Sequence, residues 1–398
     1  MRSIFVLFVI LFAIIVWFAL DFYFGRQQHF SEKNTLFHPP RKGNAEFFSV
    51  GTQFFSTLFQ DLKHAKSFIF VQFYIIRNDP IGNELLQILK NRAADGVEVY
   101  LLVDAVGSHK LPKKTIKQLR ESGIFVAYSQ RPKLPYLFYS LNRRNHRKIT
   151  VVDSKVGYIG GFNVGEEYLG RDPRLGQWRD YHLRLTGDVL ESFLEVIRFD
   201  WKVATSEDLF PPVTEPVENG AQSFQIFATN GAYMAHFFLE YIENAEQSIF
   251  IGTPYFIPGR KMVLALIAAV KRGVRVTILI PMKADHAFVK EAAFPYLLPL
   301  LHAGADVYRY YPGFYHAKVM MIDRKVCDIG TANFDKRSFY LNDEVNCLFD
   351  SPDLIHKIEK ILEFDIQESE RLTLPDLGNR SIIDRGKEMF ALSISRFL

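Results

Sequence analysis

The sequence predicts an α/β fold in two similar halves, preceded by one helix that spans a membrane. Three observations lead to this prediction. An eight-residue pattern, HxKxxxxD, occurs twice, beginning at His146 and at His316. Each copy follows a similar succession of strand-like apolar runs and helix-period stretches, which is typical of a sheet with helices on its faces. An unbroken apolar run lies near the start of the chain.

The membrane helix is predicted from the N-terminal residues. Residues 4–20 are all apolar, and residues 22–24 extend the run to about 30 Å of helix, enough to cross a bilayer. A cleaved signal peptide is the alternative, but the end of the run lacks the small-residue site that cleavage requires. We therefore predict a transmembrane anchor over residues 1–25 and a juxtamembrane linker over residues 26–44.

The charges on either side of this helix predict its orientation. The chain's amino group and Arg2 precede the apolar run, whereas the basic residues that follow it are Arg26, Lys33, Arg41 and Lys42. The positive-inside rule places the more basic side in the cytoplasm. We therefore expect the rest of the chain to face the cytoplasm.

Two domains of similar pattern are predicted beyond the anchor, over residues 45–205 and 223–398. A chain of about 400 residues exceeds what one hydrophobic core usually organises. The segment between the domains, residues 206–222, is rich in proline and polar residues and is predicted to be a linker. In each domain the alternation of strands and helices predicts an α/β/α sandwich.

Matching segments support the repeat. Residues 67–76 and 248–257 are apolar enough for buried strands, and similar runs begin at Gly96 and Gly273. A helix-period stretch precedes each of the latter two runs. The stretch contains Leu85, Leu86 and Leu89 in the first half and Leu264, Ile267 and Val270 in the second.

The duplicated motif supplies side chains suited to chemistry at phosphorus. The imidazoles of His146 and His316 can act as nucleophile or proton donor near neutral pH. The ammonium groups of Lys148 and Lys318 can donate hydrogen bonds to phosphate oxygens. One copy is half a site. Two copies brought face to face would place an imidazole on each side of a phosphodiester, with cations to neutralise its developing charge.

Further candidate residues recur at matched distances. An asparagine follows each histidine by seventeen residues, and these two, Asn163 and Asn333, are the candidate phosphate-binding amides. Asp153 and Asp323 close the two motifs and complete the candidate catalytic set. Each lies at an odd offset from the face that carries His and Lys, so holding the turn is favoured over direct catalysis.

Composition sets limits on the class of protein. The net charge of +4, with charged residues well mixed, is no global signature of nucleic-acid binding. Cys327 and Cys347 lie in apolar runs and are expected to be buried, reduced thiols. The histidines outside the motifs show no metal-ligand spacing, and the paired-histidine chemistry needs no metal. We therefore expect neither a metal nor another cofactor.

In its wider context the duplicated motif resembles that of the phospholipase D superfamily and, within it, of the bacterial cardiolipin synthases. The resemblance extends from about residue 45 to the C-terminus. The segments that carry it are residues 145–153, 158–168, 178–187, 315–318, 329–338 and 341–346. Similar synthases commonly carry two N-terminal membrane spans, whereas this sequence has room for one.

The resemblance implies a fold and an activity. The two domains would pack about a pseudo-two-fold axis with the active site at their interface. The enzyme would be a phosphatidyltransferase of the bacterial cell membrane that joins two phosphatidylglycerol molecules through a phosphohistidine and releases glycerol. In related enzymes the N-terminal motif usually supplies the nucleophile, which assigns that role to His146 and the role of general acid to His316.

Asp180 and Glu344 occupy matching places on the strand that follows each motif. A carboxylate there can hold an imidazole by its distal nitrogen and stabilise the imidazolium, as in catalytic triads. The alternative is a carboxylate on the solvent side of a surface strand. We therefore include both as candidate His-orienting residues.

The expected partners are phosphatidylglycerol and other anionic membrane lipids. The first domain carries an insertion, residues 130–144, whose aromatic and basic side chains suit a lipid headgroup region, with an ordinary packed loop as the alternative. A phosphodiesterase that hydrolyses phospholipid or single-stranded nucleic acid is the second function considered. A scaffold with a dead site is disfavoured because both motifs are intact. The oligomeric state is left open.

Overall fold

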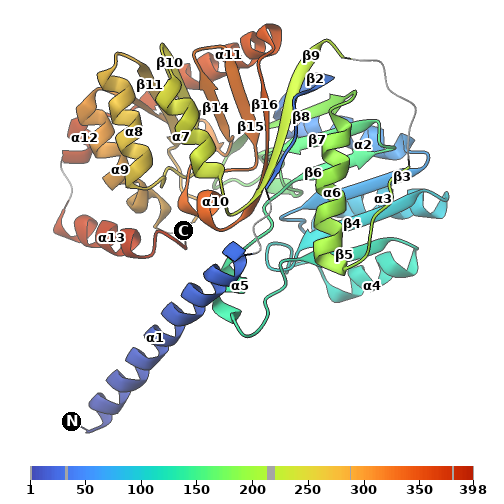
Figure 1. Ribbon diagram of the computed structural model, residues 1–398, viewed down its shortest axis with the longest axis horizontal. Helices are drawn as coiled ribbons and strands as arrows, with labels where there is room; N and C mark the ends of the chain where they lie inside the picture. The colour runs from blue at the N-terminus through green and yellow to red at the C-terminus, as the bar shows by residue number, and fades with distance from the viewer. Residues whose placement is uncertain (1, 32–34, 213–219, 287, 379–380, 398) are drawn as a thin grey trace.

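Two mixed β-sheets, each with helices on its faces, form the body of the protein, and the long helix α1 (Arg2–Ser31) projects from it (Figure 1). The computed structural model describes residues 2–31, 35–212, 220–286, 288–378 and 381–397. Residues 213–219, within the predicted linker, lie outside the described residues. The predicted α/β fold in two halves is confirmed.

The sheet of the first half has its strands side by side in the order β5, β4, β3, β6, β7, β8 and β2. The neighbours β3, β4 and β5 are parallel, and the remaining neighbours are antiparallel. The strands are β2 (Arg41–Val50), β3 (Phe68–Phe73), β4 (Glu98–Asp104), β5 (Phe125–Ser129), β6 (Ile149–Val152), β7 (Val156–Gly160) and β8 (Gln177–Thr186). The helices are α2 (Gly51–His64), α3 (Pro80–Ala94), α4 (Lys113–Glu121), α5 (Leu137–Asn142), the 3₁₀ turn η1 (Glu166–Leu169) and α6 (Leu190–Thr205).

The sheet of the second half repeats this order with β12, β11, β10, β14, β15, β16 and β9. These strands are β9 (Gln222–Asn230), β10 (Ser248–Gly252), β11 (Arg275–Pro281), β12 (Asp306–Tyr310), β14 (Val319–Ile322), β15 (Val326–Gly330) and β16 (Asp343–Phe349). Two short strands are added to this sheet, β1 (Leu36–Phe37) beside β9 and β17 (Ser369–Arg371) beside β12, whereas β13 (Gly313–Tyr315) pairs with β8 of the first sheet. The helices are α7 (Met234–Asn244), α8 (Arg260–Lys271), α9 (Val289–Ala303), α10 (Lys336–Tyr340), α11 (Pro352–Gln367), α12 (Leu374–Gly378) and α13 (Ile382–Ser393).

Each motif lies at the entry to an equivalent strand of its sheet. The apolar residues between Lys and Asp form β6 and β14, which are buried throughout because helices cover both faces of each sheet. β6 pairs antiparallel with β3, and β14 pairs antiparallel with β10. The His–Lys segments therefore emerge at corresponding ends of the two sheets.

A hydrophobic core shared by both halves holds the sheets together. It contains residues of both catalytic strands, such as Val151 and Val319, and the buried faces of α6 and α11. The helices α2, α3 and α4 cover the opposite face of the first sheet, and α7, α8 and α9 that of the second. Because each half buries apolar surface against the other, the interface is a core and not a loose contact between two separate domains.

Backbone pairing across the interface positions both histidines. The N–H of His146 donates to Asp343 O at 2.9 Å, and the N–H of His316 donates to Arg179 O at 2.7 Å. Arg147 adds a side-chain link, because its Nε donates to Glu344 O at 3.1 Å while its guanidinium pairs with Asp200. Each motif is thereby attached to the strand of the other half that carries the candidate orienting carboxylate.

The N-terminal helix differs in extent from the prediction. Among the described residues one helix, over Ile4–Phe30, is long and apolar enough to cross a membrane. Only 6% of its most apolar stretch is buried against the rest of the protein. The helix continues to Ser31, and β2 begins at Arg41, inside the segment predicted to be a linker. A contact with the body accompanies the added turns, since His29 is buried and its Nδ1 bonds the hydroxyl of Tyr139.

Two predictions about the core can be compared directly with the structure. Cys327 and Cys347 are buried and unbridged, as predicted. The helix-period residues Leu85, Leu86 and Leu89 are buried in α3, whereas in α8 Leu264 is 53% exposed and the buried residues are Met262, Val263, Leu266 and Ala269. The helix is apolar on more than one side, so periodicity alone did not distinguish its core face.

Candidate active site

His146 and His316 line one cavity of about 570 Å³ between the two halves. Both imidazoles are largely buried, with 8% and 7% of their surface exposed. Asn163 and Asn333 line the same cavity, so the two matched sets of His and Asn converge as the duplication suggests. The cavity thus presents two imidazoles and two amides to one bound group.

Each imidazole is held by a carboxylate of the other half. The Nδ1 of His146 bonds Glu344 Oε2 at 2.9 Å, and the Nδ1 of His316 bonds Asp180. Both carboxylates are fully buried, so the surface-strand alternative is wrong. With Nδ1 bonded to a carboxylate, the Nε2 of each ring is the nitrogen that can attack phosphorus or carry a proton.

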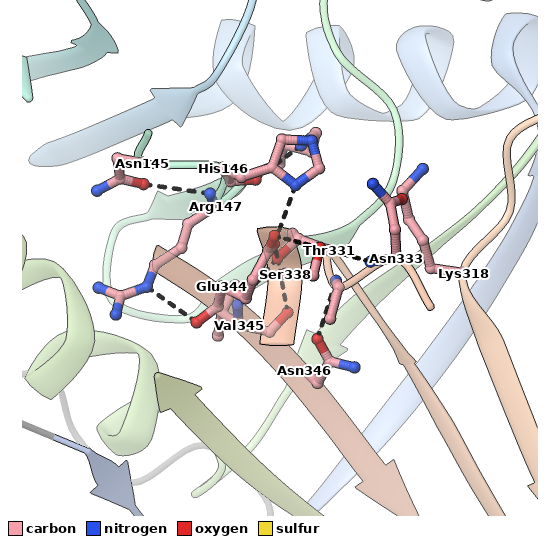
Figure 2. Close-up of polar contacts among 12 residues, drawn as sticks. Asn145, His146, Arg147, Lys318, Thr331, Asn333, Ser338, Glu344, Val345 and Asn346 are labelled. Carbon is pink, nitrogen blue, oxygen red and sulfur yellow. Dashed lines mark hydrogen bonds and ion pairs between the residues drawn. The ribbon is translucent and has the colours of Figure 1, made fainter. Parts of the chain in front are cut away.

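The Glu344 carboxylate is itself fixed by two hydroxyl groups, as Figure 2 shows. Thr331 Oγ1 donates to Oε2 at 2.6 Å, and Ser338 Oγ donates to Oε1 at 2.8 Å. In the first half, the glycine run brings the backbone against Asp180, because a Cβ on Gly161 would lie 1.9 Å from Asp180 Oδ1. Glycine at that position therefore makes room for the carboxylate.

Burial controls protonation in this cavity. It lowers the pKa of His146 to about 4 against the attraction of Glu344. Burial, followed by the Lys318 ammonium, lowers the pKa of His316 to about 4 against the attraction of Asp180. Both imidazoles are therefore neutral near pH 7. A phosphodiester anion beside them would stabilise the imidazolium and raise these pKa values.

The motif lysines are buried and contact the histidines of their own motifs. Lys148 Nζ donates to His146 O at 2.7 Å, and Lys318 Nζ lies 2.7 Å from His316 Nδ1 and 3.7 Å from Asp180. Burial lowers the pKa of Lys148 to about 7 and that of Lys318 to about 8. Concentrating two ammonium groups in a buried site is unfavourable by itself, and an anionic phosphate would offset that cost.

Asp153 and Asp323 lie away from the cavity, at the far ends of the catalytic strands. At the rise of a β-strand, the five residue steps from Lys148 to Asp153 span about 16 Å. The Asp153 carboxylate accepts hydrogen bonds from the backbone N–H groups of Lys66, Ser67 and Phe68. Asp323 accepts hydrogen bonds from the equivalent N–H groups at the start of β10. The geometry supports turn-holding over direct catalysis for both.

The left-handed backbone explains why this position suits aspartate. Asp153 has φ 51° and Asp323 has φ 53°, and each is followed by a second residue of positive φ. Asp tolerates this conformation better than most residues, and its carboxylate can reach nearby N–H groups. The aspartates thus join each hairpin to the neighbouring strand.

Several residues of the cavity were missed by the sequence analysis. Tyr74 places its ring 5.1 Å from that of His146, and Trp178 lies 4.9 Å from the His316 ring. Arg337 also lines the cavity, and its guanidinium donates to Phe397 O and Asn142 O at 2.9 Å and 2.8 Å. Trp178 and Arg337 occur within the segments that carry the family resemblance, so those segments held a signal for them.

The insertion at residues 130–144 folds back on the membrane helix. Its helix α5 packs against α1 through the rings of Phe138 and Phe18, whose centres are 4.5 Å apart. Arg144 is buried and pairs with Asp104, and Arg143 pairs with Asp343. The charges of Arg143 and Arg144 are therefore neutralised by ion pairs within the protein. Leu134, in the same insertion, is 76% exposed.

Comparison with known proteins agrees with this geometry. A family model described as "Cardiolipin synthase, PLD-like domain" matches residues 58–173 and 238–366. The chain is 38% identical over 393 residues to the minor cardiolipin synthase ClsB of Bacillus subtilis, covering 98% of this chain and 99% of that protein. It is 40% identical over 333 residues to cardiolipin synthase A of Pseudomonas putida, covering 82% of this chain and 69% of that protein.

Solved structures share the fold at low sequence identity. The phosphatidylserine synthase of Haemophilus influenzae Rd KW20 superposes with a TM-score of 0.73 at 15% identity, over 90% of this chain and 97% of that chain. A polyphosphate kinase from Porphyromonas gingivalis gives 0.56 at 14% identity, over 81% and 50% of the two chains. The fold, the extent of the family match and the similarity to whole synthases lead to one conclusion: the chain belongs to the cardiolipin synthases of the phospholipase D superfamily.

Proposed function

We propose that this protein joins two phosphatidylglycerol molecules into cardiolipin and releases glycerol. The observation that carries the proposal is the single cavity lined by both motif histidines, each with its Nδ1 on a carboxylate of the other half. Two imidazoles on opposite sides of a phosphodiester can divide nucleophilic attack and proton transfer between them.

The first step forms a covalent adduct. His146 Nε2 attacks the phosphorus of the donor lipid, and the bond from phosphorus to the glycerol oxygen breaks. His316, protonated when the anionic substrate lies beside it, gives its proton to the leaving alkoxide. Glycerol leaves, and the phosphatidyl group stays on His146. Lys148, Lys318 and the two cavity asparagines stabilise the added negative charge.

The second step reverses the roles of attack and departure. A hydroxyl of the second phosphatidylglycerol loses its proton to the now neutral His316, and its oxygen attacks phosphorus. The bond from phosphorus to His146 breaks, which regenerates the free imidazole and yields cardiolipin. One phosphodiester replaces another, so the reaction needs no ATP. The assignment of His146 as nucleophile follows from the family's use of its N-terminal motif.

Mass spectrometry of the lipid products tests this proposal. Purified protein in bilayers of phosphatidylglycerol is expected to produce cardiolipin and glycerol in equal amounts. Phosphatidic acid and glycerol as the main products would instead show a phosphodiesterase. An unchanged lipid pool would contradict both lipid reactions and would favour a nucleic-acid substrate.

We further propose that the body of the protein faces the cytoplasm. Arg26, Arg41 and Lys42 follow the apolar run of residues 4–24 on the side of the body, in agreement with the positive-inside rule, and Lys33 lies outside the described residues. Glu121 is exposed, so a Glu121→Cys variant offers an exposed thiol, whereas Cys327 and Cys347 are buried. A membrane-impermeant maleimide is expected to label this variant only after the cells are permeabilised. Labelling of intact cells would place the body outside.

A further inference from the structure

A second cavity, separate from the one that holds the histidines, lies where α1 meets the body. This crevice of about 620 Å³ is bounded by α1, Phe138 of α5 and the C-terminal segment from Leu392 to Phe397. Its wall is aromatic, with the rings of Phe22 and Phe397 5.3 Å apart and those of Phe138 and Phe397 5.4 Å apart. A wall of this kind favours hydrocarbon over water.

Positive charge gathers at the same crevice. Arg26, Lys336 and Arg396 line it, and no acidic side chain does among the described residues. Lys336 Nζ donates to Ser395 Oγ at 2.7 Å, which orients its ammonium there. An apolar wall with cations at its margin matches a molecule that has both acyl chains and a phosphate.

The crevice lies beside the end of the apolar run of α1, where we expect the bilayer to meet water. The apolar run of α1 ends beside it, and α1 projects from the body on the side where α5 lies (Figure 1). Trp17 and Tyr23 are exposed on this part of the helix, as aromatic side chains are at membrane interfaces. A lipid can therefore enter the crevice sideways from the bilayer, with its phosphate at the level of Arg26.

The crevice and the catalytic cavity adjoin each other. Phe397 lines both of them. Lys336 and Arg337 are consecutive at the start of α10, and Lys336 lines the crevice while Arg337 lines the catalytic cavity. A phosphate bound at Lys336 would thus lie on the side of the crevice that adjoins the catalytic cavity.

We propose that this crevice is the binding site for the acceptor lipid, an inference that rests on the proposed function. The donor's phosphate must occupy the cavity between His146 and His316, so the acceptor's own phosphate needs a second cationic site. Arg26, Lys336 and Arg396 hold that phosphate, and the aromatic wall holds the acyl chains. The three-carbon glycerol headgroup then extends past Phe397 with its terminal hydroxyl toward the phosphatidyl-histidine.

The double variant Lys336→Gln/Arg396→Gln separates the acceptor site from the donor site. Two reactions are measured in phosphatidylglycerol bilayers: cardiolipin formation, and exchange of labelled free glycerol into phosphatidylglycerol. Exchange uses the donor site and the histidines but no acceptor lipid. The ratio of cardiolipin formation to exchange is expected to fall about tenfold or more, because hydrogen bonds to a charged group are lost.

Two comparisons make the test specific. The matched control Lys271→Gln/Arg275→Gln removes the same charge from exposed residues outside both cavities and is expected to keep the wild-type ratio. An unchanged ratio in the Lys336→Gln/Arg396→Gln variant would overturn the acceptor site. Wild-type protein that performs neither reaction would instead refute the proposed function, so the two failures are distinguishable.

Photocrosslinking provides a readout that does not depend on turnover. His146→Ala protein in bilayers that contain phosphatidylglycerol with a diazirine near the glycerol end of its acyl chain is irradiated and digested. Adducts are expected on the peptides that contain Phe138 and Leu392, and they are expected to decrease in the Lys336→Gln/Arg396→Gln background. Adducts confined to the N-terminal part of α1 would contradict the proposal.

Discussion

Replacing either His146 or His316 by alanine is expected to abolish cardiolipin formation. Each imidazole lines the catalytic cavity from a different half, and neither can take over the duty of the other while both are needed in one step. Loss of a nucleophile removes the covalent route, and loss of a general acid alone costs about 10²- to 10⁴-fold. Product formation measured by mass spectrometry checks this expectation. Near wild-type turnover in either variant would remove the paired-histidine mechanism.

A substrate with a good leaving group distinguishes the two roles. A phosphatidyl ester of p-nitrophenol releases an anion that needs little protonation, so it depends less on a general acid. His316→Ala is expected to release p-nitrophenol in a burst and to accumulate phosphate label on His146. His146→Ala is expected to show neither. The opposite pattern would exchange the two assignments.

The second large effect is expected from the buried carboxylates. Glu344→Gln and Asp180→Asn remove a charge from the Nδ1 of His146 and of His316, respectively. A neutral amide cannot stabilise the imidazolium and can hold the wrong tautomer, so turnover is expected to fall by roughly 10²- to 10⁴-fold in each variant. Steady-state rates of cardiolipin formation provide the measurement.

The crossed pairing adds a specific expectation. Asp180 belongs to the first half but serves His316, so the p-nitrophenyl substrate is expected to restore the burst of p-nitrophenol release to Asp180→Asn and not to Glu344→Gln. Asp328→Asn is the matched control. Asp328 is buried on β15 and bonded to Asn346, and burial raises its pKa to about 8, so it is already neutral near pH 7. Equal rescue of Asp180→Asn and Glu344→Gln would refute the division of roles.

The catalytic residues of the candidate site were predictable because they belong to a short sequence motif that occurs twice. Two copies of His, Lys and Asn at equal spacings identify equivalent positions whatever their surroundings. The apolar residues that follow each lysine predict a buried strand, and β6 and β14 are such strands. Even the turn-holding interpretation of Asp153 followed from strand period alone, and its hydrogen bonds support it.

Contacts between distant segments were less predictable. Leu264 shares the helical period of core residues, yet the packing of α8 leaves it exposed. Arg337 enters the cavity because its guanidinium is held by the carbonyl groups of Phe397 and Asn142, which are far away in sequence. The packing of α5 on α1 depends likewise on where the chain returns, which no local pattern records.

The sequence by itself determined the α/β repeat, the membrane helix and the pair of half-sites, because periodicity and spacing are local properties of a chain. Only the tertiary structure decided that Glu344 serves His146 and Asp180 serves His316. Residues ahead of each motif pair with a strand of the opposite half, so each carboxylate is brought to the imidazole of the other domain. That exchange depends on burial of a shared core, which is a property of the whole fold.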